Sequence, residues 1–272
     1  MAGTGSLRLS DSEALEILSA QLEGVLVGGL ALAMWAHFFG VTPPSALQAG
    51  VTSDLDFLGT RFDARISFER LLRTVETAIG FREATLSDST SNSARIWIHG
   101  FHDRRDPIGI DYLIGLAGYT RQEEDALRAC AVEASFDGLK LTIMHPVDCL
   151  VSRVRNVWTL PEKRTPASIA QCHLAVAVVR AYFTEVCRMG PETQRREGLK
   201  MVERVAALAC SDVGLNAAFE FDVNVLNAIP ADEFSSSQFR EKRWPQIQQA
   251  VAEGIEKLKR QRERRRRRVK PA

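Results

Sequence analysis

The sequence predicts an α+β protein, in which a mixed sheet flanked by helices is followed by a helical domain. In the first half of the 272 residues, short β-branched runs alternate with segments that have helical spacing. The second half contains almost only helical patterns. We therefore expect a sheet-containing domain over residues 1–145, a helical domain over residues 146–256, and a basic, disordered tail over residues 257–272.

Local patterns predict the elements of the first half. Pro43 and Pro44 mark a loop, because proline neither continues a helix nor donates a hydrogen bond within a sheet. Gly80 suits the C-terminal end of a helix. The expected helices cover residues 10–22, 29–39 and 67–79, and the expected strands cover residues 25–27, 54–58, 94–99, 108–114 and 139–143.

In the second half, helical spacing predicts four helices separated by polar or irregular segments. Residues 211–239 show no clear period, so we expect an irregular segment there. The expected helices cover residues 147–157, 167–188, 198–209 and 245–260.

Composition is that of an ordinary globular protein, with 45% hydrophobic and 25% charged residues. The N-terminus is polar and does not resemble a secretory signal. The longest apolar run, residues 25–39, is too short to span a bilayer, so no membrane contact is expected. The five cysteines show no CxxC spacing, and their odd number argues against a disulfide framework. We expect reduced thiols in a cytoplasmic protein.

The net charge of +1 hides an asymmetry. The segment 257–270 holds ten Lys or Arg residues and one Glu, which leaves 25 basic and 33 acidic residues, about −8, in the rest of the chain. Such a tail could bind a nucleic-acid backbone, associate with the acidic body, or remain a solvated end. All three interpretations stay open at this point.

Asp54 and Asp56 are the first candidate site residues. Alternate residues of a strand point to the same face, so both carboxylates are expected together. Two like charges this close repel unless a cation lies between them. Oxygen ligands of this kind suit Mg²⁺ or Mn²⁺. The pair therefore predicts a divalent metal site.

Two further features complete the predicted site. Gly28 and Gly29 stand between a short strand and a helix, where backbone N–H groups can meet a phosphate. Asp111 lies at the centre of the apolar strand IGIDYLI, where an unpaired charge would be costly. If that strand neighbours the strand of Asp56, the three carboxylates Asp54, Asp56 and Asp111 converge, and they could hold two metal ions for phosphoryl or nucleotidyl transfer.

Each aspartate also has an ordinary structural interpretation. Asp54 could cap a turn, Asp56 could be a surface residue, and Asp111 could pair with an arginine. These alternatives apply more readily to one aspartate than to all three behind a Gly-Gly strand end.

Together these motifs resemble the nucleotidyltransferase superfamily that includes DNA polymerase β. Its pattern is a strand ending in Gly-Gly or Gly-Ser, a helix, Asp-x-Asp on a strand and a third aspartate on a later strand. The forms VGGLAL and TSDLDFL are most similar to the abortive-infection and type IV toxin nucleotidyltransferases. The resemblance covers about residues 22–165. It implies that Thr52 and Ser53 contact the nucleotide together with Gly28 and Gly29.

The same group usually continues with Pro-x-Asp-Leu and then a lysine on the next turn. Here Pro146-Val147-Asp148-Cys149 precedes Leu150, and Arg153 stands where the lysine would fall. Arginine keeps the positive charge and could bind the triphosphate, but it cannot act as a base. Gly29 replaces the usual serine, so backbone amides would have to hold the phosphate.

The resemblance implies an enzyme, a Mg²⁺-dependent (or Mn²⁺-dependent) nucleotidyltransferase that moves a nucleoside monophosphate from an NTP to an acceptor hydroxyl. The acceptor would be RNA, such as tRNA reached through the basic tail 257–270, or a protein. A toxin or phage-defence role with an antitoxin partner is also implied. The alternative is a non-catalytic module of the same fold that binds nucleic acid or a protein partner.

Overall fold

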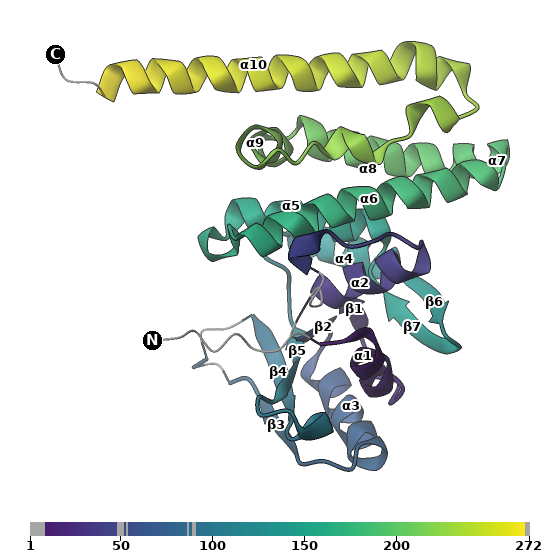
Figure 1. Cartoon of the computed structure of the whole chain (residues 1–272), viewed down its shortest axis with the longest axis vertical. Helices are drawn as coiled ribbons and strands as arrows, with labels where there is room; N and C mark the ends of the chain where they lie inside the picture. Colours follow the sequence, from purple (N-terminus) through teal and green to yellow (C-terminus); the bar gives the residue numbers. More distant parts are fainter. Residues whose placement is uncertain (1–8, 48–51, 53, 86, 89–90, 270–272) are drawn as a thin grey trace. The chain divides into compact units, whose positions relative to one another are not determined.

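A computed structural model describes residues 9–47, 52, 54–85, 87–88 and 91–269 (Figure 1). Its contacts divide the chain into two compact units, Met1–Ser152 and Arg153–Ala272. The first unit contains a seven-stranded mixed sheet and the second consists of helices, which confirms the predicted α+β class. The division falls inside one helix, α5 (Pro146–Thr159), whereas the sequence places a boundary after residue 145.

The sheet has the strand order β3-β4-β5-β2-β1-β7-β6. Two neighbouring pairs are parallel, β2 with β5 and β1 with β7, and the other pairs are antiparallel. The central strands β5, β2 and β1 therefore carry the sequence motifs side by side. The strands are β1 (Val25–Val27), β2 (Leu55–Leu58), β3 (Ile79–Glu83), β4 (Asn92–Ile98), β5 (Ile108–Leu113), β6 (Val132–Phe136) and β7 (Leu139–Ile143).

The two faces of the sheet differ in chemistry, because side chains alternate along each strand. On one face Ile96 of β4, Ile110 of β5 and Leu55 of β2 stand in one row across the strands, and all three are fully buried. One position further along, the opposite face carries Arg95, Asp111 and Asp56 in the matching row. The first face builds the core of this unit, and the second presents charged groups.

Helices of the first unit begin at clear signals. α1 (Asp11–Leu18), α3 (Arg61–Thr74) and α4 (Arg121–Ala129) each follow a capping box, in which a Ser or Thr hydroxyl and an acidic side chain exchange hydrogen bonds with the first turn. α2 (Gly28–Phe38) instead starts directly from β1.

The helix expected over residues 67–79 is displaced in the structure. α3 begins at Arg61 because Thr60 accepts a hydrogen bond from the Asp63 N–H at 3.3 Å, and Asp63 accepts one from the Thr60 N–H at 2.7 Å. Residues from Ile79 onward form β3, which pairs with β4. The prediction was wrong at both ends, because it missed the capping box and because strand pairing outweighed local helical spacing.

The second unit is built around long helices in three tiers, with α6 in one tier, α8 and α9 in the next and α10 in the last (Figure 1). Its core contains Phe183 of α6, which is fully buried and lies 6.0 Å from Phe234 between ring centroids. The longer helices after α5 are α6 (Pro166–Arg188), α8 (Leu199–Cys210), α9 (Asp212–Phe221) and α10 (Trp244–Val269).

Two predictions for this half need correction. The segment 211–239, expected to be irregular, contains α9, which Ser211 caps by accepting a hydrogen bond from the Gly214 N–H at 3.2 Å. The tail, expected to be disordered from residue 257, is helical as far as Val269. Lysine, arginine and glutamate are good helix formers, and the helix is already started within the packed unit.

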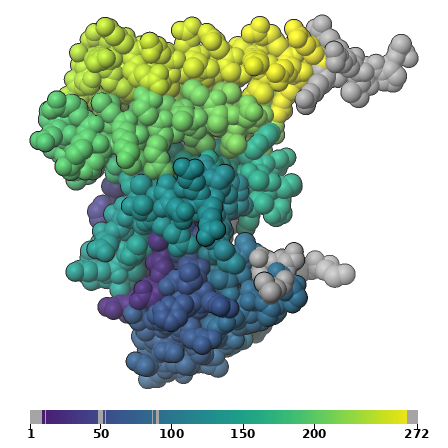
Figure 2. All heavy atoms as spheres, turned by 180° about the vertical axis from the view of Figure 1, so that it is seen from behind, coloured from purple at the N-terminus to yellow at the C-terminus, as the bar shows by residue number. Residues whose placement is uncertain are grey.

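Arg262 shows how the basic segment joins the rest of the unit. Its guanidinium donates to Asn216 at 3.2 Å, pairs with Glu220, and lies 4.7 Å from the ring centroid of Phe219, all on α9. Gly254 of α10 also packs closely, since a Cβ there would lie 2.7 Å from a methyl group of Leu215. The yellow helix lies against the green ones in the space-filling view (Figure 2). The basic segment of α10 is therefore in contact with α9 within this unit.

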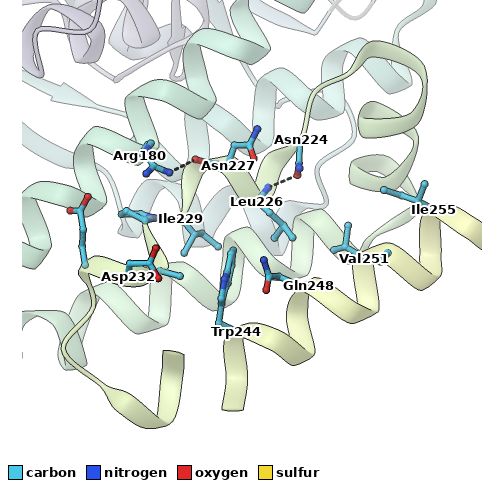
Figure 3. Close-up of a pocket in the computed structure, with 14 residues that line it drawn as sticks. Arg180, Asn224, Leu226, Asn227, Ile229, Asp232, Trp244, Gln248, Val251 and Ile255 are labelled. Carbon is cyan, nitrogen blue, oxygen red and sulfur yellow. Dashed lines mark hydrogen bonds between the residues drawn. The ribbon is translucent and has the colours of Figure 1, made fainter. Parts of the chain in front are cut away.

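A cavity of about 630 Å³ lies in the helical unit, beside the first turns of α10 (Figure 3). Trp244, Gln248 and Val251 of α10 line one side. Across from them, Arg180 of α6 donates to the Asn227 carbonyl at 3.1 Å and braces the opposite wall. The cavity contains none of the motif residues.

We predict that Leu71→Ala lowers the free energy of unfolding by about 2–5 kcal/mol, because the Leu71 side chain is fully buried on α3. Leu72→Ala is the matched control on the same helix, since Leu72 is 54% exposed, and it should change stability by less than about 0.5 kcal/mol. Urea unfolding followed by circular dichroism measures both. Equal losses in the two variants would contradict the placement of α3.

Candidate active site

The sheet brings two of the predicted carboxylates together. β2 and β5 are parallel neighbours, and Asp56 is the direct partner of Asp111 in their register. The adjacency on which the sequence argument depended is therefore confirmed. Asp54 lies just before β2, so it is held by the bend that leads into the strand. The Asp111 side chain is 16% exposed, against 43% for Asp54.

Gly28 allows the chain to pass close to the Asp56 carboxylate. A Cβ on Gly28 would lie 2.2 Å from Asp56 Oδ2, and the residue has a φ of +76°, which favours glycine. Asp56 thus packs against the first residue of α2. The positive end of a helix stabilises a nearby anion, and the same N–H groups can bind phosphate.

α2 is fixed so that its first turn stays at the sheet. The indole N–H of Trp35 donates to the Met144 carbonyl at 2.8 Å, next to the end of β7. Trp35 is 4% exposed, and Gly29 is also buried. Trp35 therefore belongs to the core, and its packing holds the start of α2 at the sheet.

Arg95 of β4 lies between the other two carboxylates. Its Nε is 3.2 Å from Asp111 Oδ1, and a terminal nitrogen is 3.8 Å from Asp54 Oδ1. Both contacts pass over Gly109, where a Cβ would lie 2.6 Å from the guanidinium and 3.0 Å from Asp54 Oδ1. The alternative that Asp111 pairs with an arginine is therefore what the structure shows.

Three effects act on the pKa of the Asp111 carboxyl. Burial raises its pKa, and the nearby Asp54 raises it further, while Arg95 acts in the opposite direction. Asn92 donates a hydrogen bond to Asp111 Oδ1 at 2.8 Å and so holds one oxygen in place. The group is therefore an oriented carboxylate whose charge is costly in its surroundings.

Sequence reasoning missed Arg95 and Asn92. A signal was present, because the expected strand over residues 94–99 alternates, and alternation sets Arg95 and Trp97 on the face opposite Ile96 and Ile98. That this face meets Asp111 follows only from the pairing of β4 with β5.

The remaining predicted nucleotide contacts, in different parts of the chain, are Thr52, Ser53 and Arg153. The Thr52 hydroxyl accepts a hydrogen bond from the Asp54 N–H at 3.4 Å and donates to the Asp54 carbonyl at 3.1 Å, so it shapes the bend before β2. Ser53 lies outside the described residues. Arg153 belongs to the helical unit, where it donates to Gln171 Oε1 at 3.2 Å.

The carboxylates are of the right chemical type for a hard divalent cation. In the described part of the chain, however, no group of three or more His, Cys, Asp or Glu side chains is close enough to hold a metal ion. The positive charge beside Asp54 and Asp111 is the Arg95 guanidinium. A divalent ion at this site would replace those contacts.

Comparison with known proteins adds no family assignment, because no protein-family model and no curated protein matches the chain. Among the described residues, none of the helices has the length and apolar character needed to cross a membrane.

We predict that Gly28→Ala destabilises the protein more than Gly138→Ala. Both glycines have positive φ values, +76° and +85°, so each alanine costs about 1–2 kcal/mol in backbone strain. Only at Gly28 does the new Cβ also collide with Asp56, whereas at Gly138 it would meet no described atom within 4 Å. Urea unfolding compares the two, and equal losses would contradict the close approach of Gly28 to Asp56.

We also predict that Arg95→Ala lowers the apparent Kd for Mn²⁺ several-fold, because Asp54 and Asp111 then repel without a compensating charge. Isothermal titration calorimetry without nucleotide measures this. Arg65→Ala is the control, since Arg65 pairs with Glu83, which belongs to the opposite face of the sheet. Unchanged or weaker Mn²⁺ binding in Arg95→Ala would show that the arginine does not compete with the metal.

Proposed function

We propose that the protein is a metal-dependent nucleotidyltransferase that moves a nucleoside monophosphate from an NTP to an acceptor hydroxyl. The observation that carries the proposal is the pairing of Asp56 with Asp111 on parallel strands while Gly28 brings the start of α2 against Asp56. Paired carboxylates and a phosphate-binding helix start are two complementary halves of a nucleotide site. The motif resemblance of VGGLAL and TSDLDFL supports the same activity.

Each group has a task in this reaction. Asp54, Asp56 and Asp111 would hold Mg²⁺ or Mn²⁺, which when bound neutralises phosphate charge and lowers the pKa of a coordinated hydroxyl. The backbone N–H groups at Gly28 and Gly29 would hold the phosphates, as the first turn of α2 favours anions. Asn92 keeps Asp111 oriented. These residues position the reactants, which is the larger part of catalysis in phosphoryl transfer.

In the proposed transfer, one bond forms and one bond breaks at the α-phosphorus. The acceptor oxygen forms a bond to the α-phosphorus of the NTP, and the bond from that phosphorus to the bridging oxygen of pyrophosphate breaks. Pyrophosphate leaves with its electron pair. The acceptor proton passes to Asp111 or to solvent.

RNA is the acceptor class that we favour over protein. α10 carries a run of basic residues toward its end, and basic residues bind nucleic-acid backbones by counterion release. A toxin or phage-defence role, tRNA as the specific acceptor and an antitoxin partner form the finer part of the proposal, which rests on the resemblance alone. A cytoplasmic location fits the same interpretation.

The second candidate is a non-catalytic module that binds nucleic acid or a protein. One observation favours it: the Arg95 guanidinium already places a positive charge beside Asp54 and Asp111. Arg153, where relatives of similar motif have lysine, points the same way. The direct pairing of Asp56 with Asp111, with Asp54 just before β2, counts against it, because a pure binding module has no need of these carboxylates.

The test is incubation of the purified chain with each α-³²P-labelled NTP, Mg²⁺ and total RNA. Label should enter RNA, and Asp54→Ala should abolish the transfer, because the carboxylate is required for the chemistry. Asp106→Asn, an exposed aspartate ahead of β5, is the matched control and should keep full activity.

Label in a protein band instead of RNA would keep the transferase and change its acceptor. Transfer that survives in Asp54→Ala, or no transfer with any NTP in the presence of Mg²⁺ or Mn²⁺, would reject the enzyme and leave the binding module.

A further inference from the structure

The charged face of the sheet continues beyond the carboxylates onto β4 and β3. Arg95 pairs with Asp111 on one side and with Arg82 on the other, so the row of charged residues runs on to the edge strand. In the neighbouring row Trp97 stands between Gly80 and Gly109. Two arginines and a tryptophan therefore share the face that carries the proposed catalytic aspartates.

A pocket of about 310 Å³ opens on this face. Arg82, Asn92, Arg95 and Trp97 line it, together with Asp88. Its volume is at the lower end of the range of small-ligand sites, about 300–1,000 Å³. Asn92 and Arg95 also contact Asp111, so the pocket adjoins the carboxylates directly.

Trp97 is free of bulky neighbours within its row. Both flanking positions are glycines, and a Cβ on Gly80 would lie 3.4 Å from the indole ring. The Arg95 guanidinium carbon is 5.8 Å from the ring centroid, within the range of a cation–π contact. Trp97 is only half-buried although it is a large apolar side chain. A tryptophan and an arginine exposed together on a sheet are suited to stacking with a nucleobase.

Arg82 adds a second positive charge. Its guanidinium pairs with Asp88 at 2.6 Å and is 62% exposed. Arg82 and Arg95 belong to paired positions on β3 and β4, so their charges stand on adjacent strands. A nucleic-acid backbone also presents successive charges, and arginine contacts phosphate with two parallel hydrogen bonds.

The order of the strands separates this pocket from the proposed donor site. β1 and the start of α2, with Gly28 and Gly29, lie on one side of the β2–β5 pair, and β4 and β3 lie on the other. In-line transfer requires the attacking hydroxyl and the leaving pyrophosphate on opposite sides of the phosphorus. If the Gly-Gly turn holds the leaving group, the attacking hydroxyl comes from the side of β4.

We propose that Arg82, Arg95 and Trp97 form the acceptor site, which takes the unpaired terminal nucleotide of a single-stranded nucleic acid. The terminal base stacks on Trp97, and the backbone phosphates contact Arg82 and Arg95. Arg95 also contacts Asp54 and Asp111. This inference rests on the proposed function for the assignment of an acceptor, but the binding itself can be measured without any reaction.

The experiment uses the full chain and fluorescein-labelled six-nucleotide single strands, one RNA and one DNA of the same sequence. Fluorescence anisotropy at low salt, without NTP or metal, gives their Kd values. Trp97→Ala should raise the Kd about 5- to 100-fold, since stacking of one base on an aromatic ring contributes that factor. Arg82→Ala should weaken binding for all sequences and reduce the slope of log K against log salt by about one.

Trp158→Ala is the matched control. Trp158 is also half-buried and has an arginine over its ring, Arg164 at 5.4 Å, but it belongs to the helical unit. It should leave the Kd unchanged. Trp97→Phe keeps an aromatic ring and should retain most of the affinity, so it separates lost stacking from a folding defect in Trp97→Ala.

The outcomes separate this inference from the proposed function. Nucleotide transfer that depends on Asp54 but is indifferent to Trp97→Ala would overturn the acceptor site and leave the enzyme intact. Binding that depends on Trp97 without transfer from any NTP would support the site and reject the enzyme. If the Kd for the oligonucleotides is unchanged in Trp97→Ala and binding depends on the basic helix instead, the inference is overturned. It is also overturned if Trp97→Ala weakens the binding of NTP but not that of the oligonucleotides. The ratio of the RNA and DNA affinities identifies which strand the site takes.

Discussion

Compensation of negative charge at the centre of the sheet is the constraint on which this site depends. Asp56 and Asp111 are direct partners on parallel strands, and Asp54 lies just ahead of them. Carboxylates this close destabilise one another unless positive charge is near. The fold supplies it twice, through the start of α2 beside Asp56 and through the guanidinium of Arg95 between the other two. Both sources also suit a site that binds phosphates.

The sheet can carry these charged side chains because its two faces have different tasks. Ile96 and Ile110 of one face are fully buried and belong to the core, while the opposite face carries the charged residues. Glycines at positions 28 and 109 then let charged side chains approach the backbone where any Cβ would collide with them. The catalytic proposal and the acceptor proposal both depend on this second face.

The helical unit provides a different kind of surface. α10 is apolar where it packs, as at Val251, and strongly basic toward its end. Arg262 ties the basic segment to α9, so the first charges of this segment are held on an ordered helix. An ordered basic helix binds a nucleic-acid backbone with a smaller loss of chain entropy than a disordered tail would. This agrees with an RNA acceptor in the proposed reaction.

Local patterns were sufficient to predict much of the molecule. The strands around Val25, Asp56 and Asp111 and the helix after Gly28 are where the sequence placed them, because apolar runs with β-branched residues and a glycine ahead of a helical period are local signals. Some errors arose where a local capping signal was missed, at Thr60 before α3 and at Ser211 before α9. The others arose where contacts distant in sequence decided the outcome. β3 is a strand because it pairs with β4, and the basic segment is helical because it continues a helix that packs on α9.

The same distinction applies to the site. The sequence by itself identified the candidate carboxylates and glycines, since Asp54 and Asp56 are two residues apart and Gly28 and Gly29 stand between an apolar run and a helical pattern. Only the tertiary structure decided what surrounds them. The register of β4 against β5 sets Arg95 opposite Asp111, and that register depends on burial of Ile96 and Ile110 rather than on the charged residues themselves. Because the packing of the opposite face decides that Arg95 lies beside Asp111, the residues around Asp111 in the sequence do not predict this contact.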